Sequence, residues 1–187
     1  MKSILRSALV LFFVLTIICC VVYPFAMTGI GQLLFPHQVA GSMLPGDKGS
    51  ELIGQEFSSP KYFWGRVSAT SPMPYNATNS SGSNNAPTNP ALADEIKGRI
   101  AALKAADRTN AAPIPVDLVT SSASGLDPEI SLAAAYYQVN RVASERKLNP
   151  TVVRQTVDKL STPQYFGFFG EARVNVLALN VALDQHQ

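Results

Sequence analysis

Charge is scarce in this sequence, and its distribution excludes one large class of function. Only 15% of the 187 residues are Asp, Glu, Lys or Arg, against about 25% in ordinary soluble proteins. None of them lies between Arg6 and Asp47. Lys2 and Arg6 are two of the 15 basic residues. The chain beyond Arg6 therefore has 13 basic residues against 13 acidic ones, and its formal net charge is zero. A neutral domain lacks the basic excess that supplies most affinity for nucleic acid, and we therefore exclude nucleic-acid binding.

Cysteine and histidine are also rare, which narrows the available chemistry. Cys19 and Cys20 lie together in an apolar run, so the rest of the chain has no disulfide framework, and the sequence assigns these two thiols no role. The histidines are His37 and the penultimate His186. A serine nucleophile usually needs a histidine base held beside it. Neither histidine is placed to serve the serine-rich stretch "SSASGLDPEIS", Ser121 to Ser131, so we predict no catalytic residue and keep a serine hydrolase only as an alternative.

Phosphate and metal motifs are missing as well. The patterns G-x-x-x-x-G-K-[ST] and G-x-G-x-x-G do not occur. Asp117 and Asp127 have no clustered His, Cys or Glu at metal-ligand spacing, so we predict no metal site. One short uncharged stretch could offer backbone N–H groups to an anion and is a weak nucleotide candidate. It comprises Ser81, Gly82, Ser83 and Asn84.

The charge-free N-terminal part predicts a membrane anchor. The apolar run from Ala8 to Ile30 reaches about 34 Å as a helix, enough to cross a hydrocarbon core of about 30 Å. It is longer than the apolar core of a cleaved signal peptide, the alternative reading, and lacks a small-residue cleavage site. We predict an uncleaved transmembrane helix over residues 7–31.

The positive-inside rule orients this helix. Lys2 and Arg6 precede it and few charges follow, which predicts a cytoplasmic N-terminus, residues 1–6, and places the bulk of the chain outside. The Gly- and Pro-rich residues 32–50 form a connector. Residues 51–187 form a single extracytoplasmic domain.

Residue patterns in this domain predict an α+β fold. β-branched and aromatic content, or apolar residues alternating with prolines, predicts short strands; these are residues 51–57, 62–67 and 112–120. Apolar periodicity predicts three helices. One begins at Pro90, one covers the Ala-rich stretch after Ser131, and one begins at Pro150. The C-terminal segment fits a helix through Leu177 and Val181, although Val174 and Val176 also suit a strand.

Caps and turns are predicted from Asn-Pro pairs and from the serine-rich stretch. Asn and Asp side chains cap helices, and proline suits the first helical position. The predicted pairs are Asn89 with Pro90, Asn149 with Pro150, and Asp127 with Pro128, which we expect to open a helix after a tight turn at Gly125.

The stretch Ser71 to Pro90, "SPMPYNATNSSGSNNAPTNP", contains no charge. Its Pro, Asn and Tyr residues are mixed without repetition, which favours an ordered loop held by side-chain to backbone bonds over a disordered linker. Long ordered loops in compact domains tend to be functional.

Five segments occur in an order typical of one family. They are "YFWGR" (Tyr62–Arg66), "YNATNSSGSNNAPTNP" (Tyr75–Pro90), "PVDLVTSSASGLDPEIS" (Pro115–Ser131), "QVNRVA" (Gln138–Ala143) and "GFFGEARVNVLALN" (Gly167–Asn180). Behind one N-terminal span they resemble the C subunit of the Kdp-type potassium-transporting P-type ATPase, the KdpC family, over nearly the whole chain. The chain differs from the family pattern at Asn85-Ala86, where Leu-Gly is expected, and at Ala172, where Pro is expected.

The resemblance implies a non-catalytic accessory subunit of an ATP-driven potassium uptake pump in the bacterial inner membrane. It implies two partners, a channel-like potassium-binding subunit and an ATP-hydrolysing P-type subunit, in addition to membrane lipid. The subunit would be needed for assembly and would act as a catalytic chaperone that raises the ATP affinity of the catalytic subunit. It would bind no cofactor on its own, because the complex handles ATP and potassium.

From this resemblance we expect the domain to lie near the potassium entrance, with the uncharged loop against a partner subunit. The interface candidates are Tyr75, Asn76, Ser83, Asn84, Thr88 and Asn89. An extracytoplasmic domain does not meet cytoplasmic ATP, so we expect any effect on ATP affinity to pass through the helix. A free-standing membrane-anchored binding module is the other alternative.

Overall fold

The computed structural model describes residues 2–46 and 48–185, and they divide into two compact units, residues 1–43 and 44–187. The first unit is a long apolar helix made of α1 (Lys2–Thr16), a π-helical segment η1 (Ile17–Val22) and α2 (Tyr23–Leu34), followed by the single turn α3 (Pro36–Val39). The most apolar 18-residue window of Ser3–Leu34 has a mean hydropathy of 2.7, and none of that window is buried. This helix is long and apolar enough to cross a membrane.

The π-helical segment has a local cause in the sequence. Pro24 follows directly after it, and proline clashes with the carbonyl of the residue four positions earlier in a regular helix. The Tyr23 N–H instead donates to the oxygen of Ile18, five residues back. The wider turn therefore accommodates Pro24 without breaking the helix.

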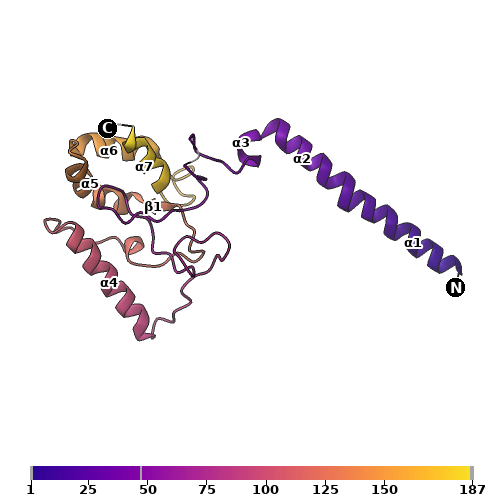
Figure 1. Ribbon diagram of the computed structural model, residues 1–187, viewed down its shortest axis with the longest axis horizontal. Helices are drawn as coiled ribbons and strands as arrows, with labels where there is room; N and C mark the ends of the chain where they lie inside the picture. The colour runs from indigo at the N-terminus through magenta and orange to yellow at the C-terminus, as the bar shows by residue number, and fades with distance from the viewer. Residues whose placement is uncertain (1, 47, 186–187) are drawn as a thin grey trace. The chain divides into compact units, whose positions relative to one another are not determined.

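The second unit combines helices with a small sheet, which confirms the predicted α+β class (Figure 1). Its helices are α4 (Pro90–Ala106), the 3₁₀ turn η2 (Val116–Leu118), α5 (Leu132–Arg146), α6 (Pro150–Leu160) and α7 (Val176–Asp184). Its strands are β1 (Glu129–Ser131), β2 (Ser161–Thr162) and β3 (Arg173–Asn175), in the antiparallel order β1-β3-β2.

The core lies where α5, α6 and α7 meet. Ile130 is paired with Val174 across the sheet, and both side chains are buried. Fully buried apolar side chains come from all three helices, from η2 and from the coil segment at Phe63; they include Phe63, Leu118, Val142, Val153, Val157, Leu179 and Leu183. Helix α4 contributes Leu103, and Figure 1 shows it apart from the other three.

Asparagine begins three of these helices. The Asn89 side chain accepts a hydrogen bond from Ala91 N, with Pro90 as the first residue of α4. Asn149 accepts from Thr151 N in the same way before Pro150, and Asn175 accepts from Ala178 N. These bonds satisfy N–H groups that have no partner inside the helix.

Two kinds of sequence prediction were wrong. Among the described residues, 51–57, 62–67 and 112–120 contain no strand: Val67 makes only an isolated bridge with Ser121, and Val116–Leu118 is a 3₁₀ turn. Helix α5 does not begin at Pro128, because residues 129–131 pair with β3 and Ser131 caps the helix. Asp127 instead accepts from Glu129 N, which makes a turn before the strand. The C-terminal segment is both strand and helix, with Val174 in β3 and Val176 at the start of α7.

Candidate interaction site

The segment Tyr62–Arg66 is bonded by side-chain amides in place of a neighbouring strand. Asn180 of α7 accepts from Phe63 N at 2.8 Å and donates to Phe63 O at 3.0 Å. Gln138 of α5 accepts from Trp64 N at 2.8 Å and donates to Trp64 O at 3.1 Å. A primary amide has an oxygen that accepts and an NH₂ group that donates. Each of these side chains therefore bonds both the N–H and the carbonyl group of one residue, as a neighbouring strand would. This explains why a segment with strand composition forms no ladder.

Two buried arginines of α5 bond the carbonyl groups of residues 60–62, where this segment begins. Arg141 donates to the carbonyl oxygens of Pro60 and Tyr62. Arg146 donates to Lys61 O at 2.7 Å and pairs with Asp184 of α7 at 2.9 Å. The guanidinium group offers five donors in a fixed geometry, which suits several carbonyl oxygens at once.

Trp64 lies between two guanidinium groups. Arg141 lies 4.5 Å and Arg99 of α4 lies 5.2 Å from the ring, within the range of cation–π attraction. Arg99 also donates to Leu118 O at 3.0 Å and Gly65 O at 3.2 Å. Burial lowers the pKa of Arg141 to about 10 and lowers that of Arg99, so both remain charged at neutral pH.

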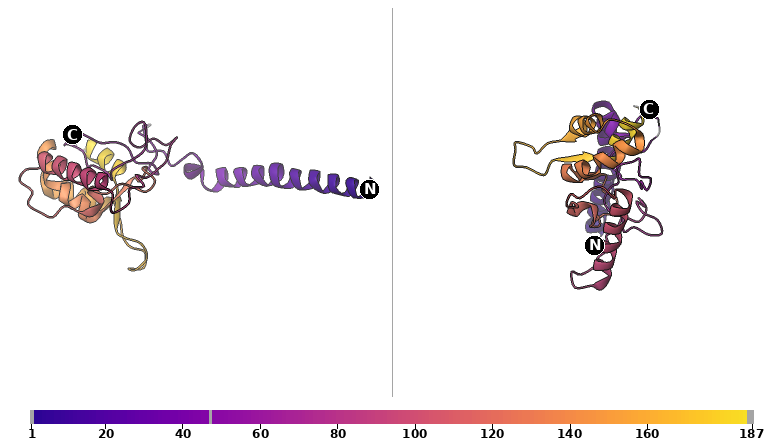
Figure 2. Two further views of the ribbon diagram at one scale, coloured as in Figure 1. Left: turned by 90° about the horizontal axis from the view of Figure 1, so that it is seen from below. Right: turned by 90° about the vertical axis from the view of Figure 1, so that its left-hand side faces the viewer.

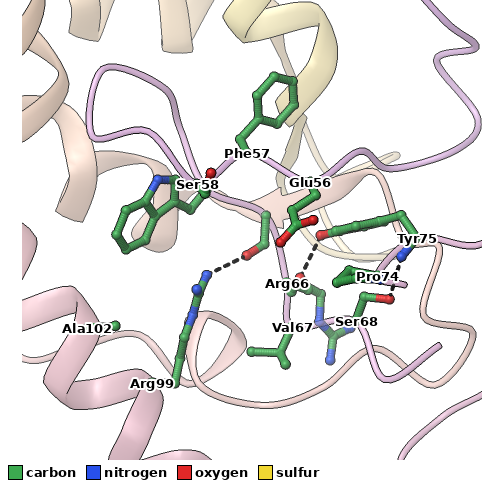
Figure 3. A pocket seen from close by; sticks show the side chains of 12 residues that line it. Glu56, Phe57, Ser58, Arg66, Val67, Ser68, Pro74, Tyr75, Arg99 and Ala102 are labelled. Atoms are coloured by element: carbon green, nitrogen blue, oxygen red, sulfur yellow. Dashed lines mark hydrogen bonds between the residues drawn. The ribbon is translucent and has the colours of Figure 1, made fainter. Parts of the chain in front are cut away.

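Arg99 borders an open cavity of about 330 Å³ on this segment (Figure 3). Glu56, Arg66, Tyr75 and Trp64 also line it. The site offers one carboxylate and two guanidinium groups together with aromatic surface. It can bind a polar partner group, but the residues lining it contain no nucleophile beside a base.

Tyr75 joins the cavity to the uncharged loop. Its hydroxyl donates to Arg66 O at 2.6 Å, and its N–H donates to the Ser68 hydroxyl at 2.8 Å (Figure 3). A side chain at Gly65 would place its Cβ 2.6 Å from the Tyr75 hydroxyl oxygen, and one at Gly54 would lie 2.4 Å from the ring. Burial raises the pKa of Tyr75 to about 12. Tyr75 is therefore an internal support of the loop.

The loop is ordered by its own polar side chains. Asn76, which is buried, donates to Ser71 O and accepts from both the backbone N–H and the hydroxyl of Thr78. Its own N–H donates to the Thr70 hydroxyl at 3.0 Å. Asn79 donates to the same Ser71 oxygen. Such side-chain to backbone bonds replace the ladder that a loop lacks.

The serine-rich stretch forms the platform on which this loop lies. Ser81 N donates to Ser124 O at 3.0 Å, and the hydroxyls of Ser83 and Ser121 are 3.0 Å apart. Gly125 has φ +69°, and a Cβ there would lie 2.7 Å from the Ser81 carbonyl oxygen. Glycine is needed at this position for the backbone conformation and for the close approach.

The serine hydroxyls have structural partners. The hydroxyls of Ser122 and Ser124 are 3.2 Å apart, and they accept from the N–H groups of Gly125 and Leu126. The Ser121 hydroxyl faces Ser83. None of these contacts is with a histidine, lysine or carboxylate, so the geometry shows no activated nucleophile. Among the described residues, no three His, Cys, Asp or Glu side chains cluster as metal ligands.

The structure divides the predicted interface residues into two groups. Asn84 and Thr88 are exposed, whereas Ser83 and Asn89 are half-buried, and Tyr75 and Asn76 face inward. Asn84 lies near the platform, with φ +52°. The exposed face of the loop extends over residues 77–80 and 86–88. We call these two segments together with Asn84 the uncharged face.

The sequence reasoning missed the amides and arginines that hold Tyr62–Arg66. A signal for them exists, because each polar residue falls on an apolar stripe of its helix. Asn180 lies four residues after Val176 and three before Leu183, so all three share one face of α7. Gln138 likewise lies three residues after Ala135 and four before Val142, both buried, on one face of α5. A polar residue at a core position indicates a specific buried partner.

Together these features define a class: a small protein with one apolar helix able to span a membrane and an α+β domain that carries a long, ordered, uncharged loop. Comparison with known proteins identifies the family. The sequence model of the family described as "K+-transporting ATPase, c chain" (KdpC) matches residues 5–185. The chain belongs to the KdpC family.

Curated relatives match over essentially their full length. The chain is 66% identical to the potassium-transporting ATPase KdpC subunit of Herminiimonas arsenicoxydans, over all of both chains. It is 64% identical to the KdpC subunit of Janthinobacterium sp. (strain Marseille), over 99% of this chain and 100% of the relative. The KdpC subunit of Paraburkholderia xenovorans is 61% identical over 99% of this chain and 98% of the relative.

Proposed function

We propose that this chain is the non-catalytic accessory subunit of an ATP-driven potassium uptake pump. The observation that carries this proposal is the full-length similarity to subunits named for a potassium-transporting ATPase. The serine hydroxyls support it, because they are bonded to one another, to Ser83 and to backbone N–H groups. The role left to such a chain is assembly and regulation of larger partners.

The charge pattern supports a cytoplasmic N-terminus in the inner membrane. Lys2 and Arg6 precede the helix, and the next formal charge is at Asp47, so the positive-inside rule places the domain outside. Added outside intact cells, a membrane-impermeant thiol reagent should label an A101C variant in a C19A/C20A background, because Ala101 is exposed on α4 and lies outside the proposed interface. Labelling only after the membrane is opened would place the domain in the cytoplasm.

The uncharged face is the surface that we assign to the channel-like subunit, near the potassium entrance. Its residues carry no formal charge. The bonds of Asn76 order the loop internally, and those of Ser81 and Ser83 fix it against the platform. A pre-ordered loop loses little conformational entropy on binding. A surface without charge also leaves the electrostatic potential for an approaching K⁺ undisturbed.

Direct contact with nucleotide is less well supported by the loop geometry. Of the stretch Ser81–Asn84, Ser81 N already donates to Ser124 O, and the backbone of Ala123 covers Gly82 at 2.9 Å from an added Cβ. We propose that the chain raises the ATP affinity of the catalytic subunit from outside, through the transmembrane helix. The apparent KM for ATP of the complex should then rise when the helix is exchanged for an unrelated apolar helix that still permits assembly.

Two experiments test the proposal directly. Purification of the tagged chain in mild detergent should recover two larger membrane proteins, whereas a free-standing binding module would purify alone. Crosslinking from T88C should then yield a product with the channel-like subunit. Thr88 suits this better than Ser83, whose hydroxyl already contacts Ser121. A cysteine at Ala101, exposed on α4 between Lys97 and Lys104, is the matched control, and equal crosslinking from both positions would count against the uncharged face.

A further inference from the structure

The connection between β2 and β3 ends in an exposed aromatic tip, residues 165–170. Its aromatic side chains retain large exposed fractions: 60% for Tyr165, 87% for Phe166, 69% for Phe168 and 58% for Phe169. In both views of Figure 2 the connection projects from the body of the domain. Soluble surfaces rarely expose so much contiguous aromatic area unless it binds something.

The backbone of the aromatic tip is held in a defined turn. Tyr165 and Phe169 exchange backbone hydrogen bonds of 3.0 and 2.9 Å, and the Gln164 side chain donates to Gly170 O at 2.8 Å. Phe166 and Gly167 have φ angles of +54° and +77°. A positive φ is unfavourable for a bulky residue such as phenylalanine, yet here it presents the ring to the surroundings.

No formal charge lies between Lys159 and Glu171. The tip is therefore apolar at its end, and the first charge beyond it is that of Glu171, on the arm that leads to β3. The nearest cation on β3, Arg173, is already paired with Glu129 at 2.7 Å. The tip can leave water without removing a charged group from solvent.

The chain itself keeps the domain close to a bilayer. Val39 ends α3 and Leu44 begins the second unit, so the residues between them span at most about 14 Å when fully extended. A domain of this length has a radius of gyration of about 15 Å. The tip is consequently held at high effective concentration beside the membrane on which the chain is anchored.

We propose that the aromatic tip inserts into the interfacial layer of the bilayer that anchors the chain, as a second membrane contact. Aromatic rings concentrate at the level of the lipid headgroups, and this tip has the rings, the fixed turn and the neutrality that such a position favours. The contact restrains rotation of the domain about its short linker. The proposal applies on either side of the membrane and is independent of the subunit's role in a pump.

Tryptophan fluorescence can measure where the tip lies. The full chain carrying F166W is reconstituted into phosphatidylcholine–phosphatidylglycerol vesicles, with or without acyl chains brominated close to the glycerol backbone. Wild-type protein, whose single tryptophan is the buried Trp64, supplies the background. Because indole rings settle at this depth, brominated lipid should quench about half of the added emission, and aqueous iodide should quench little of it. F168W tests a second ring of the same tip.

A101W is the control, because Ala101 is exposed on α4 between two lysines. Its emission should respond to iodide and not to brominated lipid. If F166W is quenched by iodide as strongly as A101W and is unaffected by brominated lipid, the tip does not touch the membrane and the proposal is wrong. If iodide protection then arises only on co-reconstitution with the other pump subunits, the tip binds a protein instead, which also overturns the proposal.

Discussion

Asn180 provides the sharpest test of how the domain is held together. The N180A change removes the acceptor for Phe63 N and the donor for Phe63 O, and both atoms belong to a fully buried residue of the core. An unsatisfied buried backbone group costs about 1–3 kcal/mol. After allowance for the amide that no longer has to be buried, we expect the free energy of unfolding to fall by about 3 kcal/mol.

For a domain of about 140 residues, the unfolding entropy converts this loss into a fall of about 10 °C in Tm. Emission of Trp64, which neighbours Phe63 and is the only tryptophan, reports the transition in the full chain in detergent. N79A is the matched control, because Asn79 is exposed and makes one bond to Ser71 O; its effect should stay within about 0.5 kcal/mol. A loss below about 1 kcal/mol for N180A would refute the view that this amide replaces a strand partner.

Three further predictions concern the loop, its platform and a helix cap. Y75F loses the 2.6 Å bond to Arg66 O and should lower the free energy of unfolding by about 1 kcal/mol at neutral pH. Folding raises the pKa of Tyr75 from 10.0 to about 12, so its contribution is present below pH 10 and is lost as the pH rises toward 12; Tm measured against pH should fall less steeply there in Y75F. G125A forces φ +69° on alanine, with Cβ 2.5 Å from a side-chain atom, and should lose about 2–4 kcal/mol in thermal unfolding. N149A removes the cap on Thr151 N and should lose about 1 kcal/mol by urea unfolding, whereas N149D should retain most of it.

The features that the sequence predicted well depend on local physics. The apolar run from Ala8 to Ile30 is readable because bilayer thickness sets its length. The starts of α4 and α6 are readable because each Asn-Pro pair needs only the next few residues to act as a cap. The order of the uncharged loop also follows from its own composition, since most of its bonds join residues close in sequence.

The predictions that were wrong concern features whose hydrogen-bond partners lie far along the chain. Tyr62–Val67 has strand composition, but its partners are side-chain amides from α5 and α7. The positions of Gln138 and Asn180 on apolar stripes indicate that each has a buried partner, but they do not identify residues 62–67 as that partner. Residues 129–131 were read as helix because Asp127-Pro128 resembles a cap, whereas pairing with β3, more than forty positions later, extends them. The exposure of the aromatic tip likewise depends on a distant partner, because it follows from the pairing of β2 with β3.

The bonds between Phe63 and Asn180 also constrain how the protein is made. They join residues 117 positions apart, and Arg146 needs Asp184, one helix turn beyond Asn180, to balance its charge. Chain synthesis runs from the N-terminus, so Phe63 can gain these bonds only after residue 180 has been added. Such distant closure slows folding, and a chain that stops before Asn180 would leave the buried N–H and carbonyl groups of Phe63 without these partners.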